Sequence, residues 1–220
     1  MARRTNQKIW KNHIILCEGR DAEEVLISYL NSDALSDEPA FSNDFQVMDF
    51  GGITDLTPFI ATLKNMEGYD RIESLLIIRD AERDPEQAIR DIKSALTRNA
   101  LVVPTEPHRW EGSSPRIGYL LFPFCETDVC PGTLEDLCLS ILSESNNQEI
   151  LTDIQSFMDA LQHTRGRVFP HEFKTKLHTY FSITDAYVSL KTGESAKAGA
   201  FDWSNPKLAS LKNFLLELLS

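Results

Sequence analysis

Three acidic residues at alternate positions, Asp80, Glu82 and Asp84, follow directly after the short apolar run Leu75–Ile78. The run is typical of a strand buried on both faces. If the chain stays extended, residues i, i+2 and i+4 share one face, so the three carboxylates converge. Like charges that close repel unless a cation or shared protons offset them, and Mg²⁺ prefers oxygen ligands. The alternative is a solvated acidic turn before a helix, whose first turn favours acids.

A second strand-to-turn junction lies near the start of the chain. The apolar run His13–Leu16 precedes Glu18 and Gly19, and Ala22–Leu30 then carries apolar residues at helical spacing. Glycine at such a turn lets the backbone bend sharply and lets a ligand approach closely. In open α/β sheets, ligands bind beyond the carboxyl ends of the strands, which is where Glu18 falls. In isolation, Glu18 is equally well explained as an exposed turn acid.

Strand and helix patterns alternate through the first half of the chain. Phe45–Phe50 reads as a strand that ends at Gly51 and Gly52, and Asp55–Asn65 reads as an amphipathic helix. This alternation predicts βαβ units and a mostly parallel, Rossmann-like sheet flanked by helices. Right-handed crossovers place the strand ends along one edge of the sheet, which we call the rim. We therefore expect Glu18, the glycine pair and the acids of Asp80–Asp84 to gather there.

The second half of the chain changes from mixed patterns to helical ones. Val102–Val103 and Arg116–Phe124 are strand candidates, and the helix predicted from Gly132 to Ser143 has Glu135 and Asp136 in its first turn, where the macrodipole favours acids. Further helices are predicted at Ile150–His163, Glu172–Phe181 and Pro206–Leu219. We therefore expect an α/β domain over residues 1–145 and a helical C-terminal extension, residues 146–220, packed on it.

The charge balance limits the classes of partner. A net charge of −11 over 220 residues argues against a protein that coats nucleic acid, since phosphate binding usually shows as a basic excess. It does not exclude an enzyme with a local basic groove. Lys174 and Lys176 stand in this acidic chain and could each reach the rim, although lysines on a helix surface are usually only solvated.

Hydropathy and cysteine spacing bear on the compartment. No apolar run approaches the roughly 20 residues that span a bilayer, and no signal-peptide core follows the basic start. We therefore expect a cytoplasmic protein that does not associate with a membrane. The four cysteines do not have zinc-site spacing, and we expect no disulfide. Cys17 and Cys138 lie in apolar patterns that are typical of core residues.

Together these segments resemble the three-part signature of the Toprim domain, the catalytic core of topoisomerases, bacterial primases and the overcoming-lysogenization-defect (OLD) nucleases. The matching pieces are Cys17–Asp21, Gly51-Gly52 and Asp80–Asp84. The later Gly132–Leu137 and the helical tail look like a small, uncharacterised Toprim-like family related to those nucleases. The resemblance covers nearly the whole chain, more loosely after Asn146.

The resemblance implies a role for each candidate residue. The strand-end Glu18 would act as general acid or base, while Asp80, Glu82 and Asp84 would bind Mg²⁺ or Mn²⁺. Second-metal ligands in the related nucleases would correspond to Asp21, Glu135 or Asp136, and a tail lysine, Lys174 or Lys176, would stabilise transition-state charge. Gly19, Gly51 and Gly52 would form the turns near the phosphate.

Two departures from the family pattern bear on catalysis. The family usually has Asp-x-Asp where this chain has Asp80-Ala81-Glu82, and it often has an acid at the position of Ala22. Asp21 or Glu23 could substitute for the second of these. The sequence therefore supports two hypotheses: a metal-dependent phosphotransfer or phosphodiester-hydrolysing enzyme acting on DNA or RNA, and a non-catalytic metal- or nucleotide-binding regulatory module. A plain interaction domain with a protein partner, in which the acids are merely solvated, is a third reading.

Overall fold

Four strands form one parallel sheet within the part of the chain that the computed structural model describes, residues 8–35, 44–125 and 129–219. The strands are β1 (His13–Cys17), β2 (Phe45–Asp49), β3 (Ser74–Asp80) and β4 (Arg116–Phe122). Their order is β2-β1-β3-β4, and each neighbouring pair runs parallel. This confirms the predicted α/β class, with a Rossmann-like parallel sheet flanked by helices and further helices towards the C-terminus.

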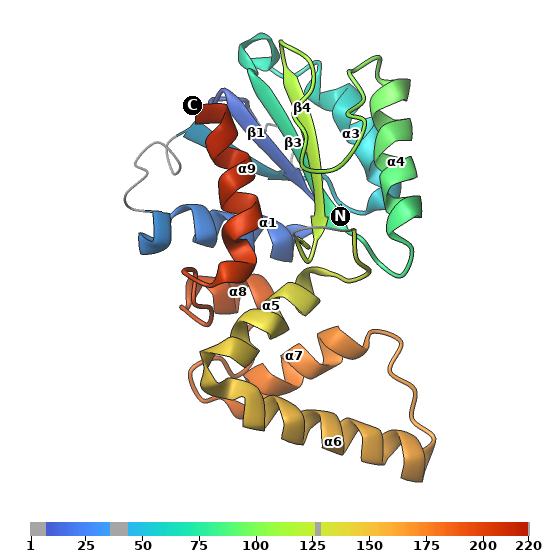
Figure 1. The fold of residues 1–220 in the computed structure, drawn as a ribbon, viewed down its shortest axis with the longest axis vertical. Coiled ribbons are helices and arrows are strands. Elements are labelled where there is room, and N and C mark those ends of the chain that lie inside the picture. The colour runs from blue at the N-terminus through green and yellow to red at the C-terminus, as the bar shows by residue number, and fades with distance from the viewer. Residues whose placement is uncertain (1–7, 36–43, 126–128, 220) are drawn as a thin grey trace.

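Helices cover both faces of this sheet and extend beyond one of its edges (Figure 1). They are α1 (Arg20–Leu30), α3 (Leu56–Leu63), α4 (Pro85–Arg98), α5 (Leu134–Leu142), α6 (Gln148–Arg165), α7 (Glu172–Ile183), α8 (Thr192–Lys197) and α9 (Ala209–Leu219). No helix of the described segments is both long and apolar enough to cross a bilayer.

The strands are apolar on both sides because both faces of the sheet are covered. Ile14 of β1 shares a buried cluster with the apolar residues of α3 and α4. Its neighbour Ile15 points to the opposite face and shares a second cluster with α1 and α9. This period of two explains why continuous apolar runs, and not alternating ones, mark β1 and β3 in the sequence.

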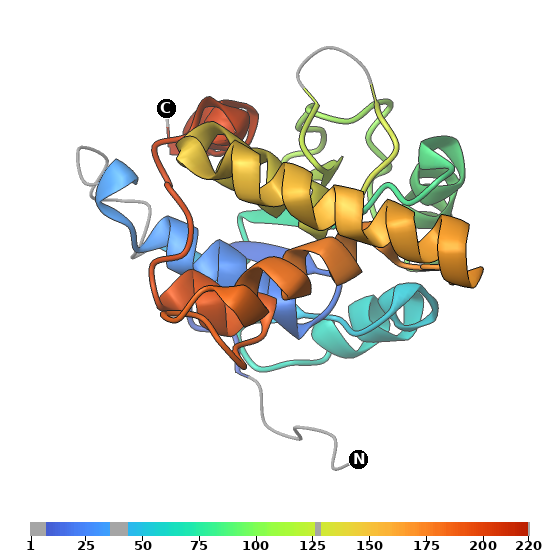
Figure 2. The same cartoon turned by 90° about the horizontal axis from the view of Figure 1, so that it is seen from below.

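The helical extension lies mostly beyond the carboxyl ends of the strands. Figure 1 shows α5, α6, α7 and α8 at that end of the molecule, and Figure 2, viewed from below, shows α6, α7 and α8 crossing the same end. The buried cluster on the α1 face continues into them through Leu137, Ile154 and Leu177. The predicted division near residue 145 falls in a π-helical turn, Ser143–Asn147, that joins α5 to α6.

The last helix, α9, returns to the sheet itself. Its Phe214 lies against the strand glycine Gly118, where an added Cβ would come within 2.8 Å of the ring. The same ring stacks on Trp110, with 4.5 Å between the ring centroids. The final segment of the chain therefore covers the edge strand β4, so the α/β layer is completed by residues from both halves of the sequence.

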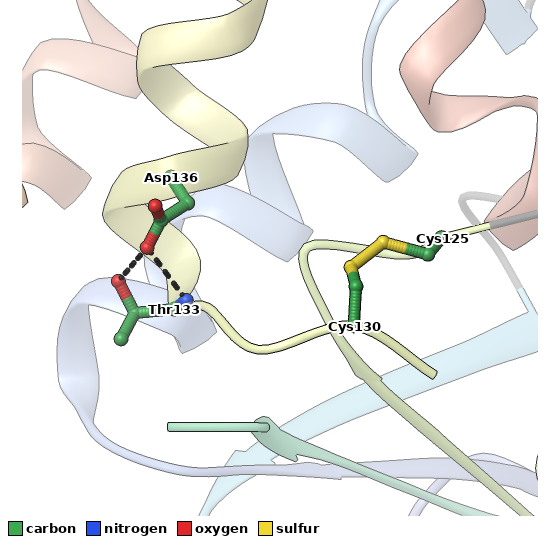
Figure 3. The surroundings of a disulfide bond; sticks show 4 residues. All are labelled: Cys125, Cys130, Thr133 and Asp136. Atoms are coloured by element: carbon green, nitrogen blue, oxygen red, sulfur yellow. Dashed lines mark hydrogen bonds between the residues drawn. A yellow bond between two sulfur atoms is a disulfide. The ribbon is translucent and has the colours of Figure 1, made fainter. Parts of the chain in front are cut away.

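The expectation of no disulfide is wrong, because Cys125 and Cys130 are bonded to each other (Figure 3). Beyond the end of β4 their Cα atoms lie 6.2 Å apart, a separation at which a disulfide can form. Sequence spacing alone does not reveal this approach in space. Cys17 and Cys138 are free and buried, as expected.

The strand candidate Val102–Val103 is also wrong. These residues have no strand partner in the described structure, and Val103 packs at the margin of the core. The loop that follows meets β4 instead: Glu111 and Ile117 exchange backbone hydrogen bonds of 2.9 and 2.7 Å, and the His108 N–H donates to the Tyr119 carbonyl at 3.2 Å. These isolated contacts add no strand to the sheet, so the local β-propensity of the two valines does not decide their conformation.

Candidate functional site

The strand ends meet at the rim, where parallel hydrogen bonding continues one residue past the strands. The Glu18 N–H donates to the Ile78 carbonyl at 3.2 Å, and the Ala81 N–H donates to the Phe122 carbonyl at 3.3 Å. Glu18 and Asp80 therefore leave two neighbouring strands, β1 and β3, at the same edge. The topology puts them where ligands bind in open parallel sheets.

Asp80 is the most perturbed acid of the rim. Burial, together with the negative charges of Glu135, Glu18 and Glu82, raises the pKa of its carboxyl to about 7. One hydrogen bond opposes this effect, because Oδ1 accepts from the Leu134 N–H at 2.8 Å, at the start of α5. Four predicted acids thus lie close enough together to act on one another electrostatically.

A buried arginine, which was not among the predicted site residues, lies next to Glu18. Arg79, on β3, is only 4% exposed. Its Nε lies 3.3 Å from Glu18 Oε2, and its Nη1 lies 3.3 Å from Asp91 Oδ2. A buried cation needs partners of this kind, and it fixes the position of Glu18 in return. The only sequence signal was a charged residue at the end of an apolar strand.

Glu82 adopts a left-handed backbone conformation, with φ at 55°. It exchanges two backbone hydrogen bonds with Gly132, of 2.8 and 2.9 Å, and its side chain is exposed. This conformation costs a non-glycine residue roughly 1–2 kcal/mol. It also ends the extended run at Asp80, so the expected face shared by Asp80, Glu82 and Asp84 is not formed.

Asp84 serves as the N-cap of α4. Its Oδ1 accepts from the Gln87 N–H at 3.0 Å, and its Oδ2 lies 3.6 Å from an Arg90 nitrogen. The side chain is 63% exposed. The contacts of Asp84 thus match the alternative reading of an acid at a helix start, and its metal role stays a prediction.

The two acids of α5 point to different partners. Glu135 is 8% exposed, and its Oε1 lies 3.2 Å from the Lys174 Nζ of α7. Asp136 accepts hydrogen bonds from the N–H and the hydroxyl of Thr133, at 2.8 and 2.9 Å, in a capping box (Figure 3). Burial raises the pKa of Asp136. Glu135 therefore acts on the rim, whereas Asp136 stabilises the start of the helix.

Lys174 is the cation that the structure brings to these acids. Burial lowers its pKa, but attraction to Glu135, Asp21 and Asp80 outweighs this effect and leaves the pKa above its ordinary value. Asp21 itself accepts from the Gly193 N–H at 3.1 Å. Of the two predicted lysines, Lys174 therefore carries its positive charge beside three of the predicted acids.

Lys176 is placed differently. It lies two positions further along α7, which corresponds to a rotation of roughly 200° around the helix. It forms no ion pair or hydrogen bond with the residues that the structure describes. Its predicted catalytic role gains no support from contacts.

The glycine turns are tied together by Asp49, the last residue of β2. Its Oδ1 accepts from the N–H groups of Gly19 at 2.9 Å and Gly51 at 2.6 Å, and both glycines have positive φ values, 87° and 90°. Gly52 donates to Asp55 Oδ2 at 3.3 Å. Asp49 was missed, although an acid directly before a Phe-Gly-Gly turn was a usable signal.

A short helix without a predictive sequence pattern, α8, lies against the start of α1. Lys197, at the end of α8, places its Nζ 3.1 Å from Glu24 Oε1, which also lies 2.8 Å from an Arg20 nitrogen. The Gly193 bond to Asp21 comes from the same helix. Six residues without an apolar repeat give no helical periodicity, which is why α8 escaped detection.

Comparison with known proteins assigns a family to this arrangement. A family model described as "Protein of unknown function (DUF3226)" matches residues 12–220. The chain belongs to the DUF3226 family. The match contains every strand, every helix and every candidate residue of the rim. No curated protein and no solved structure matched the chain.

The donor chemistry of this DUF3226 rim suits a hard cation, but the side chains as placed do not form a closed set of ligands. Among the described residues, no three Asp, Glu, His or Cys side chains stand close enough to share one metal ion. Asp80 and Glu135 are turned to partners of their own, the Leu134 N–H and Lys174 respectively. Binding a cation would require some of these contacts to be exchanged.

Proposed function

We propose that this member of the DUF3226 family is a Toprim-like phosphotransfer or phosphodiester-hydrolysing enzyme that uses Mg²⁺ or Mn²⁺ and acts on DNA or RNA at the rim. One observation carries the proposal. The half-buried Asp80 has a pKa near neutrality and lies among the charges of Glu135, Glu18 and Glu82. A divalent cation would offset the repulsion that this gathering of carboxylates creates.

We assign a separate role in the reaction to each group of rim residues. Asp80, Glu82 and Glu135 would hold the ion, which when bound would polarise the scissile phosphate and lower the pKa of the attacking water. Glu18 would take up or release a proton at its carboxylate. Arg79 would keep that carboxylate in place through their 3.3 Å ion pair.

Lys174 would supply positive charge next to the phosphate. Its side chain is half-exposed, and its ammonium group lies 3.2 Å from Glu135 Oε1. Because the neighbouring acids raise its pKa, it stays protonated at neutral pH. A positioned cation of this kind stabilises negative charge that develops on a transferring phosphoryl group.

A second candidate is a non-catalytic metal- or nucleotide-binding regulatory module. The observation that favours it is that the rim acids already have internal partners: the Leu134 N–H, Lys174 and the Gly193 N–H. Such contacts stabilise the rim without a ligand. Glu82 in place of the usual aspartate points in the same direction.

A cleavage assay separates the two candidates. Labelled single- and double-stranded DNA and RNA are incubated with the protein in Mg²⁺ or Mn²⁺, under single-turnover conditions. We expect cleavage by the native protein and a loss of at least about 100-fold in Asp80→Asn. Asp70→Asn, an exposed acid at the opposite end of the sheet, is the matched control and should cleave normally. Metal binding without any cleavage would favour the module.

The location and partners stay predictions. We infer a cytoplasmic protein that meets nucleic acid through a local site. Cytoplasmic thiols are usually kept reduced, so the Cys125–Cys130 bond weighs against this inference. A protein partner that contributes further positive charge is compatible with the acidic surface.

A further inference from the structure

The end of α6, the following turn and the first half of α7 form a basic segment, residues 163–178, which we call the basic arm. It contains four Lys or Arg residues and one acid, so its net charge is +3 in a chain of net charge −11. Three of the five histidines of the chain also lie in it. The basic arm is thus a short segment of net positive charge in an acidic protein.

The arginines of the basic arm are free to meet a partner. Arg165 ends α6, Arg167 lies in the turn, and both are exposed. Neither forms an ion pair with any residue in the described ranges. Arginine without an internal carboxylate is well suited to phosphate, which it can bind through two parallel hydrogen bonds.

The basic arm also reaches the rim. Lys174, inside the arm, forms the 3.2 Å ion pair with Glu135. Figures 1 and 2 show α7 next to α5 beyond the strand ends, with the turn between α6 and α7 projecting away from the sheet. The segment therefore leads from solvent, at Arg165 and Arg167, to the acids around Asp80.

Exposed apolar side chains accompany these charges. Phe173 is 50% exposed and directly precedes Lys174, and Val168 is 79% exposed in the turn. An aromatic ring beside cations is the combination on which unpaired bases stack while their phosphates are neutralised. Base pairs of a duplex have no free face to offer such a ring, so the combination favours single strands.

We propose that the basic arm binds single-stranded nucleic acid, with Arg165 and Arg167 on phosphates and Phe173 on a base, and directs the strand towards the rim. This inference rests on the proposed function, because it names the surface that would deliver the substrate. The net negative charge of the rest of the described chain opposes phosphate binding, whereas the basic arm attracts it.

Fluorescence anisotropy of labelled 20-nucleotide oligo-dT and oligo-U, measured in EDTA so that no cleavage occurs, tests the proposal. We expect Arg165→Ala/Arg167→Ala to weaken binding by about tenfold or more at low salt. The slope of log K against log salt should become shallower by about 1.4, the value for two lost phosphate contacts on a single strand. Phe173→Ala should weaken binding about fivefold or more, through lost stacking.

The matched control removes the same charge at the other end of the sheet. Arg71 and Arg98 are exposed and lie where β3 begins and α4 ends, so Arg71→Ala/Arg98→Ala should bind as the native protein does. Circular dichroism and thermal melting confirm that both double variants are folded. Their different binding would support the basic arm as the contact surface.

Two results would overturn this inference: equal binding by both double variants, or no binding of either oligonucleotide by the native protein. Binding to vesicles of anionic lipid in place of the oligonucleotides would also overturn it. The outcome is separable from that of the cleavage assay. Specific binding without cleavage contradicts only the proposed enzyme, whereas cleavage with unchanged binding in Arg165→Ala/Arg167→Ala contradicts only the basic arm.

Discussion

Asp80 combines a structural and an electrostatic role in one side chain. Its hydrogen bond from the Leu134 N–H helps to position the start of α5, while burial and three neighbouring acids make its ionised form unfavourable. The folded pKa of about 7 lies above the ordinary value of an unfolded aspartate, near 4. As the pH rises from about 4 to 7, the unfolded chain loses this proton before the folded one does, so folding stability falls.

Asp80→Asn should therefore stabilise the protein increasingly as the pH rises. The amide stays neutral, and its carbonyl oxygen can still accept from the Leu134 N–H. We expect the free energy of unfolding of the variant, relative to the native protein, to increase by about 1 kcal/mol or more between pH 5 and pH 8. Urea denaturation at the two pH values measures this. For the exposed Asp70→Asn we expect the difference in free energy of unfolding from the native protein to be the same at both pH values. The same result for Asp80→Asn would contradict the raised pKa of Asp80.

The sequence revealed where acids would gather but not which contacts each would make. Glu18 and Asp80 were predictable because they follow apolar strands of a parallel sheet. The sequence could not show whether Asp84 and Asp136 cap helices or bind metal, because a capping role depends on the exact residue at which a helix begins. The left-handed conformation of Glu82 ends the extended run before α4 begins. No local sequence pattern predicts a φ of 55° at a glutamate.

The contact between α1 and α8 closes one side of the rim. Gly193 of α8 approaches α1 so closely that an added Cβ would lie 2.6 Å from the Glu24 Cβ. Its N–H also reaches Asp21 at 3.1 Å. A glycine is needed here for space, since its backbone angles are not of the left-handed kind.

Gly193→Ala should destabilise the protein by about 1–3 kcal/mol, because the methyl group forces α8 away from α1. Gly52→Ala is the matched control, since an added Cβ there meets nothing within 4 Å, and we expect little change. Thermal or urea unfolding of both variants measures the difference. Equal stabilities would mean that α8 does not pack as closely on α1 as the structure indicates.

Among the elements, those with a clear apolar pattern were predictable and helix α8, which lacks one, was not. The four strands β1 to β4 and the helices α1, α3, α4, α5, α6, α7 and α9 have apolar patterns that fix their type and approximate bounds. Helix α8 is held by contacts with α1, which is distant in sequence. The Cys125–Cys130 disulfide depends on how close the two residues come in space. Apolar patterns report neither of these.

Two regions of opposite charge lie next to each other in the molecule. The rim collects acids at the carboxyl edge of the sheet, and the basic arm places a net charge of +3 next to it. The net charge of −11 was the strongest sequence argument against a nucleic-acid substrate. A total does not show how charge is distributed, and the pairing of Lys174 with Glu135 became visible only once α7 was placed beside α5.

Calorimetric titration of Mn²⁺ and Mg²⁺ into the purified protein tests most directly whether the gathered carboxylates form a cation site. We expect saturable binding to the native protein and to Asp70→Asn, weakened about tenfold or more in Asp80→Asn, since that variant removes a charged oxygen ligand. No heat of binding, or the same affinity in Asp80→Asn as in the native protein, would contradict a metal-binding rim.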